Sequence, residues 1–214
     1  MDSNDVRREW AERSGEFSPE YYAYRGPDET SERIRTVLDR EVGTDASVLE
    51  LGCSAGRHLA HLADNGYDDL HGVDINEESF DVMAEAYPDL AETGTFYVDA
   101  IESVVERFDD DRFDAVYSVE TLQHIHPDHD EVFGELTRIA DDLVVTVENE
   151  SGTEDEENVA ADGVGDASDE AVNYVNDEFP LYYRDWNAVF TELGWAEIES
   201  VSADRDTLRA FRPA

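Results

Sequence analysis

The sequence predicts an α/β fold, a Rossmann-like doubly wound sheet of seven strands, on the basis of three observations. Short apolar runs typical of buried strands alternate along the chain with segments of helical periodicity. The first of these runs ends in an acid, and a turn containing glycines follows it. The last two predicted strands are joined by only four residues, which is too short for a parallel crossover, so they form an antiparallel hairpin.

The predicted elements follow one another regularly between residues 31 and 147. A helix over 31–42 ends before Gly43, because glycine favours the position just after a helix. The same reasoning ends a helix over 56–65 at Gly66, and Pro88 ends a helix over 76–87. The predicted strands of this part are 47–51, 70–73, 95–98, 113–119 and 142–147, and two further helices are 101–107 and 132–139.

The two ends of the chain differ from this regular part. Residues 1–30 carry Trp10 and several tyrosines among charges and predict an N-terminal arm, with a helix over 5–12. Residues 149–178 are acidic and dotted with glycine, and predict a long loop or flap, since such loops in compact domains are usually functional or disordered. A helix over 184–193 and strands over 196–202 and 207–211 complete the predicted domain, which spans residues 31–214.

The composition of the 214-residue chain is extreme in charge. The net charge is −40, and all 15 cationic side chains are arginine. Hydrophobic residues still make up 40%, so we expect a folded domain with surface acids rather than a disordered chain. This composition resembles that of proteins from salt-loving organisms, and of archaeal ones in particular. It argues against nucleic acid as a partner, because phosphates need a basic patch.

Cysteine content and hydropathy set further bounds. Cys53 is the one cysteine, which excludes an internal disulfide. The first 30 residues are polar and charged and predict no signal peptide, and no apolar run approaches the ~18 residues of a membrane-spanning helix. We therefore expect a cytoplasmic protein without a membrane partner. The sequence does not indicate an oligomeric state.

The segment VLELGCSAGRHL, residues 48–59, predicts a strand, a tight turn and the start of a helix. Glycine lets a ligand approach the backbone because it has no Cβ, and the N–H groups that open a helix attract anions. A second short strand ends in Asp74, which lies 24 positions after Glu50. This is close to the spacing at which doubly wound folds place the acid that binds a ribose. A nucleotide-like ligand is therefore expected at the strand ends.

Together with LHGVDIN, FYVDAIESV and FDAVYSVETLQHIHP, this segment resembles the class I S-adenosylmethionine-dependent methyltransferases over residues 48–127. The resemblance implies S-adenosylmethionine as the cofactor and a sheet in the order 3-2-1-4-5-7-6, with the last strand antiparallel. It also implies methyl transfer to an unidentified small or medium-sized acceptor. Many members of the family build a lid from their N-terminus, which is one interpretation of the arm; the other is simple packing on the domain.

The resemblance implies roles for particular residues at the strand ends. Glu50 would face the cofactor's amino group, Asp74 would bind the ribose hydroxyls, and Ile75 would pack on the adenine. Gly52 and Gly56 would let the backbone lie against the cofactor, whereas Ser54 replaces the family's middle glycine. The remaining implied cofactor-binding residues are Cys53 in the turn, Asp99 and Ala100 beside the adenine, and Ser118 and Val119 beside the methionine portion.

Candidate substrate residues lie in the arm and after the fifth strand. Tyr22 and Arg25 would contact the acceptor from a lid, with Arg25 pairing a carboxylate. Glu148 and Glu150 would contact a substrate amine, or are simply surface acids.

The segment 122–129 is rich in histidine, and three interpretations stay open for it. His124 acts as a general base or substrate contact, as a histidine suits proton transfer near neutral pH. Alternatively, His124, His126 and His129 bind a metal with Asp128. In the third, which competes most strongly with the first, the histidines are structural. We expect no metal site here, because alternating residues in a strand-like loop converge poorly.

Two other functions remain open. A regulatory or accessory protein could keep the cofactor pocket without turnover. A nicotinamide-dependent oxidoreductase is less favoured, because the chain has Gly52-x-x-x-Gly56 in place of the Gly-x-Gly-x-x-Gly fingerprint and ends in a hairpin.

Overall fold

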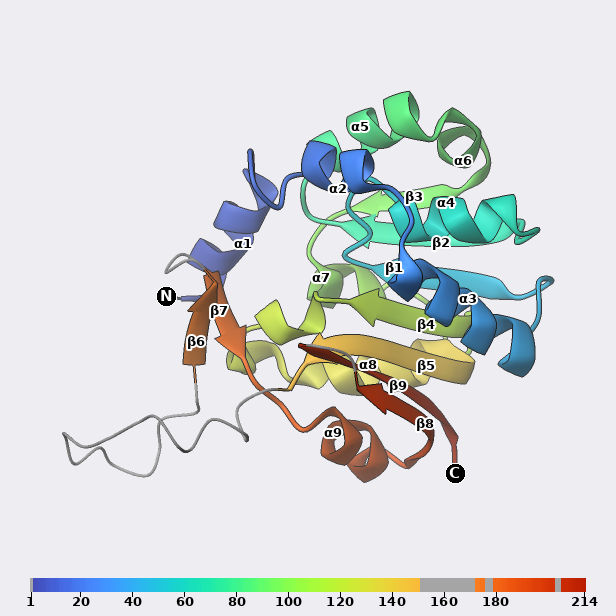
Figure 1. The fold of residues 1–214 in the computed structure, drawn as a ribbon. Coiled ribbons are helices and arrows are strands. Elements are labelled where there is room, and N and C mark those ends of the chain that lie inside the picture. The colour runs from blue at the N-terminus through green and yellow to red at the C-terminus, as the bar shows by residue number, and fades with distance from the viewer. Residues whose placement is uncertain (1, 151–171, 176–178, 203–204) are drawn as a thin grey trace.

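The computed structural model describes residues 2–150, 172–175, 179–202 and 205–214, with the backbone alone at 172–175 and 179. Much of the predicted flap at 149–178 therefore lies outside the described residues. Within these limits the chain forms one twisted sheet with helices on both faces, and the arm lies beside the strand ends (Figure 1).

Seven strands form the main sheet in the order β3-β2-β1-β4-β5-β9-β8. β1 to β5 are parallel, whereas β9 is antiparallel to both β5 and β8. The predicted order and the terminal hairpin are therefore confirmed. The strands are β1 (Ser47–Leu51), β2 (Asp69–Asp74), β3 (Thr95–Val98), β4 (Phe113–Val119), β5 (Ala140–Asn149), β8 (Trp195–Ser202) and β9 (Asp206–Pro213).

Each face of the sheet is covered by its own set of helices, because side chains alternate along a strand. On β1, Val48 belongs to the core on one face and Leu49 to the core on the other. The first face carries α3 (Glu29–Glu41), α4 (Arg57–Asp64), α5 (Glu78–Ala86) and α6 (Pro88–Thr93). The second carries α7 (Ile101–Val105), α8 (Glu131–Ile139) and α9 (Trp186–Glu192).

The arm folds into two helices, α1 (Ser3–Ala11) and α2 (Pro19–Arg25). Each begins at a side chain that accepts a backbone N–H, Asp2 for α1 and Ser18 for α2. Pro19 supports the start of α2, since proline has no N–H to leave unpaired at the first helical position. The sequence analysis predicted the first helix but not the second.

Two further differences from the sequence prediction concern proline and the flap. Pro88 ends α5 as predicted but also opens α6, a helix the prediction omitted. β6 (Val172–Val175), inside the predicted flap, pairs with β7 (Phe179–Tyr182), just after it, as a separate two-stranded ribbon. Two short 3₁₀ turns, η1 (Leu122–His124) and η2 (Pro127–His129), follow β4.

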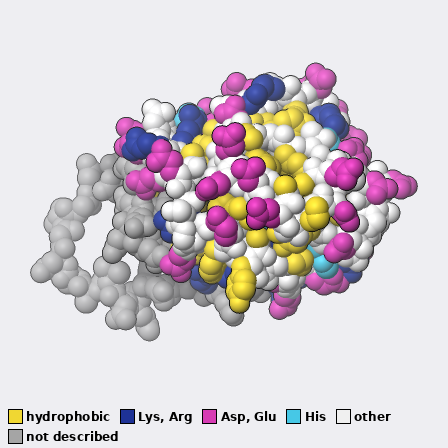
Figure 2. All heavy atoms as spheres, turned by 90° about the horizontal axis from the view of Figure 1, so that it is seen from above, with side chains coloured by type: hydrophobic (Ala, Val, Ile, Leu, Met, Phe, Trp, Pro, Cys, Tyr) yellow, Lys and Arg dark blue, Asp and Glu magenta, His cyan; other side chains and the backbone are white. Residues whose placement is uncertain are grey.

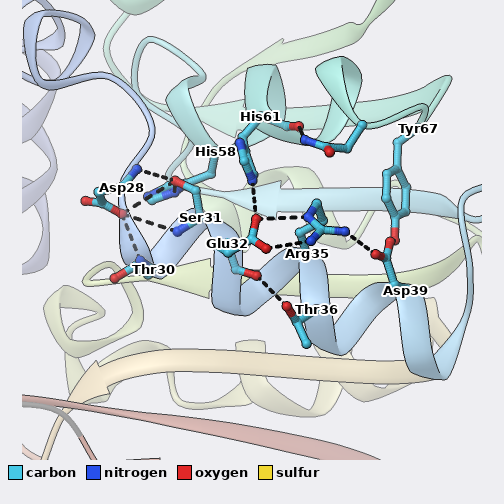
Figure 3. Close-up of polar contacts among 11 residues, drawn as sticks. Asp28, Thr30, Ser31, Glu32, Arg35, Thr36, Asp39, His58, His61 and Tyr67 are labelled. Carbon is cyan, nitrogen blue, oxygen red and sulfur yellow. Dashed lines mark hydrogen bonds and ion pairs between the residues drawn. The ribbon is translucent and has the colours of Figure 1, made fainter.

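A polar network joins α3 to α4 next to the strand ends (Figure 3). The Asp28 carboxylate accepts the N–H groups of Thr30 and Ser31 at 3.0 and 3.2 Å, and Ser31 Oγ lies 2.7 Å from His58 Nδ1. Burial, with some help from the neighbouring Arg57, lowers the pKa of His58 to about 3, so the ring is neutral at pH 7. The start of α3 is thereby tied to the start of α4.

Acidic side chains cover much of the surface of the folded domain (Figure 2), as the composition predicts, whereas Glu50 and Glu148 are buried. Figure 2 shows Asp and Glu side chains spread over the face seen from above, between groups of hydrophobic side chains. Arginines pair with many of them, for example Arg35 with Glu32 at 2.5 Å on α3. Among the residues described, we find no helix with the length and apolar character that crossing a membrane requires.

Candidate active site

A crevice of about 1180 Å³, including its open mouth, lies outside the carboxyl ends of β1 to β4. Glu50 and Gly52 reach it from β1 and its turn, Asp74 from β2, and Asp99 from the end of β3. Residues of the arm line it from the other side, including Trp10 and Phe17. This is the place where an open α/β sheet binds its ligand.

The turn after β1 has a backbone that only small residues allow. Gly52 has φ +68°, and a Cβ there would lie 2.3 Å from Thr121 Oγ1. Gly56 has φ +78°, and its Cβ would meet Met83 Cε at 2.7 Å. Ser54 also has a positive φ, 47°, which is uncommon outside glycine. All three positions of the turn therefore have a positive φ, although serine stands at the middle one.

Cys53 occupies the same turn and is 2% exposed. Its backbone N–H donates to Val73 O at 2.9 Å, and burial raises the pKa of its thiol. A buried thiol of this kind is a packing residue rather than a nucleophile.

Glu50 is the most unusual titratable group of the crevice. Its side chain is 1% exposed, and Oε2 has no hydrogen-bond partner among the described residues. Burial raises its pKa to about 8, although Tyr117 and Arg57 act in the opposite direction. A buried acceptor atom without a donor is costly unless a ligand satisfies it. The site is thus suited to a cation or donor placed over the glycine turn.

Asp74 is held rigidly at the end of β2. One carboxylate oxygen accepts the Ser54 N–H at 2.7 Å; the other accepts the Asn76 N–H at 2.8 Å and the Ser79 hydroxyl at 3.3 Å. Burial raises its pKa, and these hydrogen bonds oppose the rise. A carboxylate offers about four lone-pair sites, so acceptor capacity remains for a ligand hydroxyl.

The end of β3 supplies the next residues of the crevice. Asp99 accepts the Ala100 N–H at 2.9 Å and pairs with Arg107 at 2.6 Å, while its own N–H donates to Asp74 O at 3.2 Å. Ile75, Asp99 and Ala100 all line the crevice. The structure therefore brings together the predicted residues from the ends of β1, β2 and β3, and Val119 from β4 joins them.

His124 lies in η1 and lines the crevice beneath α1. Its Nδ1 is 3.0 Å from the Pro180 carbonyl oxygen, which only accepts, so Nδ1 carries the proton and Nε2 keeps a lone pair. The ring centroid is 4.7 Å from that of Trp10. Burial lowers the pKa of His124 to about 4, so the ring is neutral at pH 7.

The other two histidines of this segment face different partners. His126 Nδ1 accepts the Asp128 N–H at 3.1 Å, and His129 Nε2 lies 3.1 Å from an Arg7 nitrogen. These rings serve the loop and α1 rather than one common point.

Five predicted site residues do not line this crevice: Arg25, Gly56, Ser118, Glu148 and Glu150. Glu148 is buried beneath η1, where it accepts the hydroxyl of Ser118 and the N–H groups of residues 121–123. The Ser118 side chain is buried with it. Glu150 pairs with Arg209 at 2.6 Å, and Arg25 lies in a neighbouring pocket that Tyr22 shares with the crevice.

Among the lining residues that were not predicted from the sequence are Trp10, Arg57 and Glu120. Trp10 lies over His124, and Arg57 stacks 5.2 Å from the centre of the Tyr22 ring while it pairs with Asp28 at 2.7 Å. Glu120 follows β4 with φ +48°. Their positions gave partial signals, since Arg57 follows Gly56 and Glu120 follows a predicted strand end.

Residues 48–142 match the family described as methyltransferase domain. This match covers less than half of the chain, which is therefore similar to methyltransferase domains over this part. The prediction of class I made from the sequence is confirmed at the level of family and fold, because the match covers β1 to the start of β5 and the sheet order agrees.

Among curated relatives, the methyltransferase domain is similar to the O-antigen chain terminator bifunctional methyltransferase/kinase WbdD of Escherichia coli. The two are 35% identical over 109 residues, which is 49% of this chain and 15% of that protein. The O-methyltransferase cnsE of Penicillium expansum is 27% identical over 111 residues. The chain thus spans less than half the length of these relatives, at 15% and 40%.

One of the solved structures similar to the whole chain is an N1-methyltransferase of Burkholderia thailandensis that acts on 1,6-didemethyltoxoflavin. It was crystallised with this compound and S-adenosylhomocysteine. Its TM-score is 0.63 at 17% identity, with 87% of this chain and 79% of that chain covered. A protein of Pyrococcus horikoshii gives a TM-score of 0.68 at 17% identity and full coverage of both chains. These likenesses establish the fold.

Proposed function

We propose that the chain is an S-adenosylmethionine-dependent methyltransferase that acts on a small-molecule acceptor. The observation that carries the proposal is Glu50 Oε2, a buried acceptor at the glycine turn that has no hydrogen-bond partner among the described residues. The cofactor has a cationic amino group that an acidic acceptor suits, and the turn beside Glu50 has the positive φ and close Thr121 packing that only glycine allows at position 52. The residues present therefore fit the cofactor.

The roles of the site residues follow from their positions. Glu50 would receive the amino group, and Asp74 would accept a ribose hydroxyl with the lone pair that its three hydrogen bonds leave free. Ile75 and the turn at Asp99 and Ala100 would enclose the adenine, since all three line the same end of the crevice. Val119 would lie beside the methionine portion.

When bound, S-adenosylmethionine supplies an electrophilic methyl group on a sulfonium sulfur, which keeps the electron pair of the broken carbon–sulfur bond. The protein's part is to hold the acceptor in line with that bond, which can supply much of the acceleration. A lone pair of the acceptor forms the new bond to carbon, and an acceptor proton is released. The arm, residues 1–30, would act as a lid that keeps water out, because Trp10, Phe17 and Tyr22 line the crevice.

We further propose that His124 Nε2 receives the acceptor's proton. The Pro180 carbonyl fixes the tautomer that leaves Nε2 free, and the low pKa keeps the ring neutral at pH 7. His124→Gln should slow single-turnover transfer ~10²–10⁴-fold while the affinity for S-adenosylhomocysteine stays nearly unchanged. If the variant turns over at the wild-type rate, alignment alone carries catalysis and His124 is not a base.

The experiment that tests the function has two steps. Calorimetry with S-adenosylmethionine, S-adenosylhomocysteine and a nicotinamide dinucleotide establishes the cofactor. Transfer of a labelled methyl group to a panel of amines, hydroxyls and carboxylates then tests turnover. Tight binding of the sulfonium compound without any product would favour a regulatory binding protein, and nicotinamide binding alone would favour an oxidoreductase. A cytoplasmic location stays a prediction.

A further inference from the structure

A second pocket adjoins the cofactor crevice on the side of β5 and β9. Its empty volume is about 820 Å³, including the open mouth. Phe17, Tyr22, Arg57, Val119 and Glu120 line both cavities, so the two share a wall. A molecule in the second pocket would therefore lie next to the crevice, along the wall that the arm and the end of β4 form.

The walls of this pocket differ in chemistry. The arm contributes the rings of Phe17, Tyr21 and Tyr22, and the strand ends contribute aliphatic side chains, among them Val147 and Leu208. Rings on one element and aliphatic groups on the sheet favour a planar apolar body between them, because aromatic faces stack well on flat surfaces.

The rim carries charges of both signs. Four arginines line the pocket, Arg25, Arg33, Arg57 and Arg205, together with three carboxylates, Asp28, Glu120 and Asp206. Three of them pair with carboxylates: Arg33 with Glu29 at 2.5 Å, Arg57 with Asp28 at 2.7 Å, and Arg205 with Glu120 at 3.5 Å.

Arg25 differs from the other three. It donates to the Tyr21 hydroxyl at 3.0 Å and lies 5.6 Å from the centre of that ring, and no carboxylate pairs with it in the part of the chain that is described. An arginine without a carboxylate within salt-bridge distance among the described residues is available to an anion, although the charge of Asp28 also acts on it. Its planar guanidinium suits a carboxylate in particular, since the two can form parallel hydrogen bonds.

We infer that the second pocket binds the methyl acceptor and that the acceptor is a small aromatic carboxylic acid, whose carboxylate pairs with Arg25. This inference rests on the proposed function, because it names the acceptor class of the same site. The ring would lie between Tyr22 and the aliphatic wall, and the acceptor's oxygen or nitrogen would point past Glu120 toward the cofactor crevice.

The test compares two probes of the same shape, para-hydroxybenzoate and para-hydroxybenzamide. Each is titrated by calorimetry into the full chain saturated with S-adenosylhomocysteine, at one fixed salt concentration. Wild type should bind the carboxylate ~10-fold or more tightly than the amide, the scale of one charge-assisted pair. Arg25→Gln should reduce this ratio to within about twofold. Arg8→Gln removes the same charge from the arm outside the pocket and should keep the wild-type ratio.

Several outcomes would overturn the inference. They are the absence of carboxylate binding in wild type, equal binding of the two probes, or an unchanged ratio in Arg25→Gln. A further experiment compares the binding of S-adenosylhomocysteine with that of methylthioadenosine, which lacks the amino acid carboxylate. If Arg25→Gln weakens only the former, Arg25 serves the cofactor and the inference fails. If wild type does not bind S-adenosylhomocysteine, the proposed function itself is refuted.

Discussion

At the scale of single residues, Asp74 combines a rigid carboxylate with a position at the end of β2. Asp74→Ala should weaken S-adenosylhomocysteine binding by ~1–3 kcal/mol, because charge-assisted hydrogen bonds to the ribose are lost. Asp81→Ala is the matched control, since Asp81 is an exposed acid on α5. Calorimetry on the three proteins measures the difference. Equal affinities in wild type and Asp74→Ala would exclude the ribose role.

Glu50 predicts a pH dependence of stability for the ligand-free protein. Its folded pKa of about 8 lies above the ordinary value of 4.5, so between these values the folded state holds a proton that the unfolded state has lost. The free energy of unfolding should therefore fall as pH rises from ~4.5 to ~8 through this group.

Glu50→Gln removes the titrating group while it keeps the shape. Denaturation at pH 5, 6.5 and 8 should give a flatter profile for this variant than for wild type. Glu148 and His58 stay in both proteins, so their contributions cancel in the comparison. If the unfolding free energies of wild type and Glu50→Gln change in parallel with pH, Glu50 is not a buried protonated carboxyl.

At the scale of elements, Glu148 fixes the loop after β4. Its carboxylate accepts N–H groups from Thr121, Leu122 and Gln123 at 3.1–3.3 Å, and the next side chain along, His124, lines the crevice. Glu148→Gln puts an amide NH₂ against these donors and should cost ~1–3 kcal/mol of stability. The stability should be measured at pH 8, where Glu148 is ionised, because burial raises its pKa to about 7.

Glu150→Gln serves as the control for this prediction. Glu150 is an acid at the same end of β5, but it pairs with Arg209 in a partly exposed position. Its substitution should cost less than ~1 kcal/mol. If the two variants are equally stable at pH 8, the Glu148 network does not hold the loop.

The site was predictable from the sequence in some places and not in others. Acids at the ends of β1, β2 and β3 were predictable, because parallel strands end at one edge of the sheet. The direction of Glu148 was not, since β5 is buried on both faces and its apolar run shows no alternation. Arg25 was correctly expected in the arm, but only the fold places it outside the crevice.

The elements themselves divide in a similar way. All seven strands of the main sheet were predicted, because each is a short apolar run between turn residues. The β6–β7 ribbon was missed, since Pro180 argues against a strand and the two strands are short. Proline is tolerated there because a two-stranded ribbon has free edges.

At the scale of the whole molecule, charge controls stability. The surface acids repel one another in dilute buffer, and at ~1 M salt the Debye length falls to ~3 Å. The melting temperature should therefore rise as potassium chloride increases from ~0.1 M to ~2 M. A neutral osmolyte at matched osmolality separates screening from excluded-solute effects. A flat or falling melting temperature in the salt would reject the expected adaptation to high salt.

Cys53 gives the molecule a reporter of its own motion. It is the single cysteine of the chain, it lies in the turn at the crevice, and it packs so closely on β2 that a Cβ at Gly72 would meet its sulfur at 2.7 Å. A thiol reagent can therefore react only during local opening of this turn, so the modification rate measures how often it opens. A ligand that bridges the turn and Asp74 would lower the rate of Cys53 modification in proportion to its occupancy.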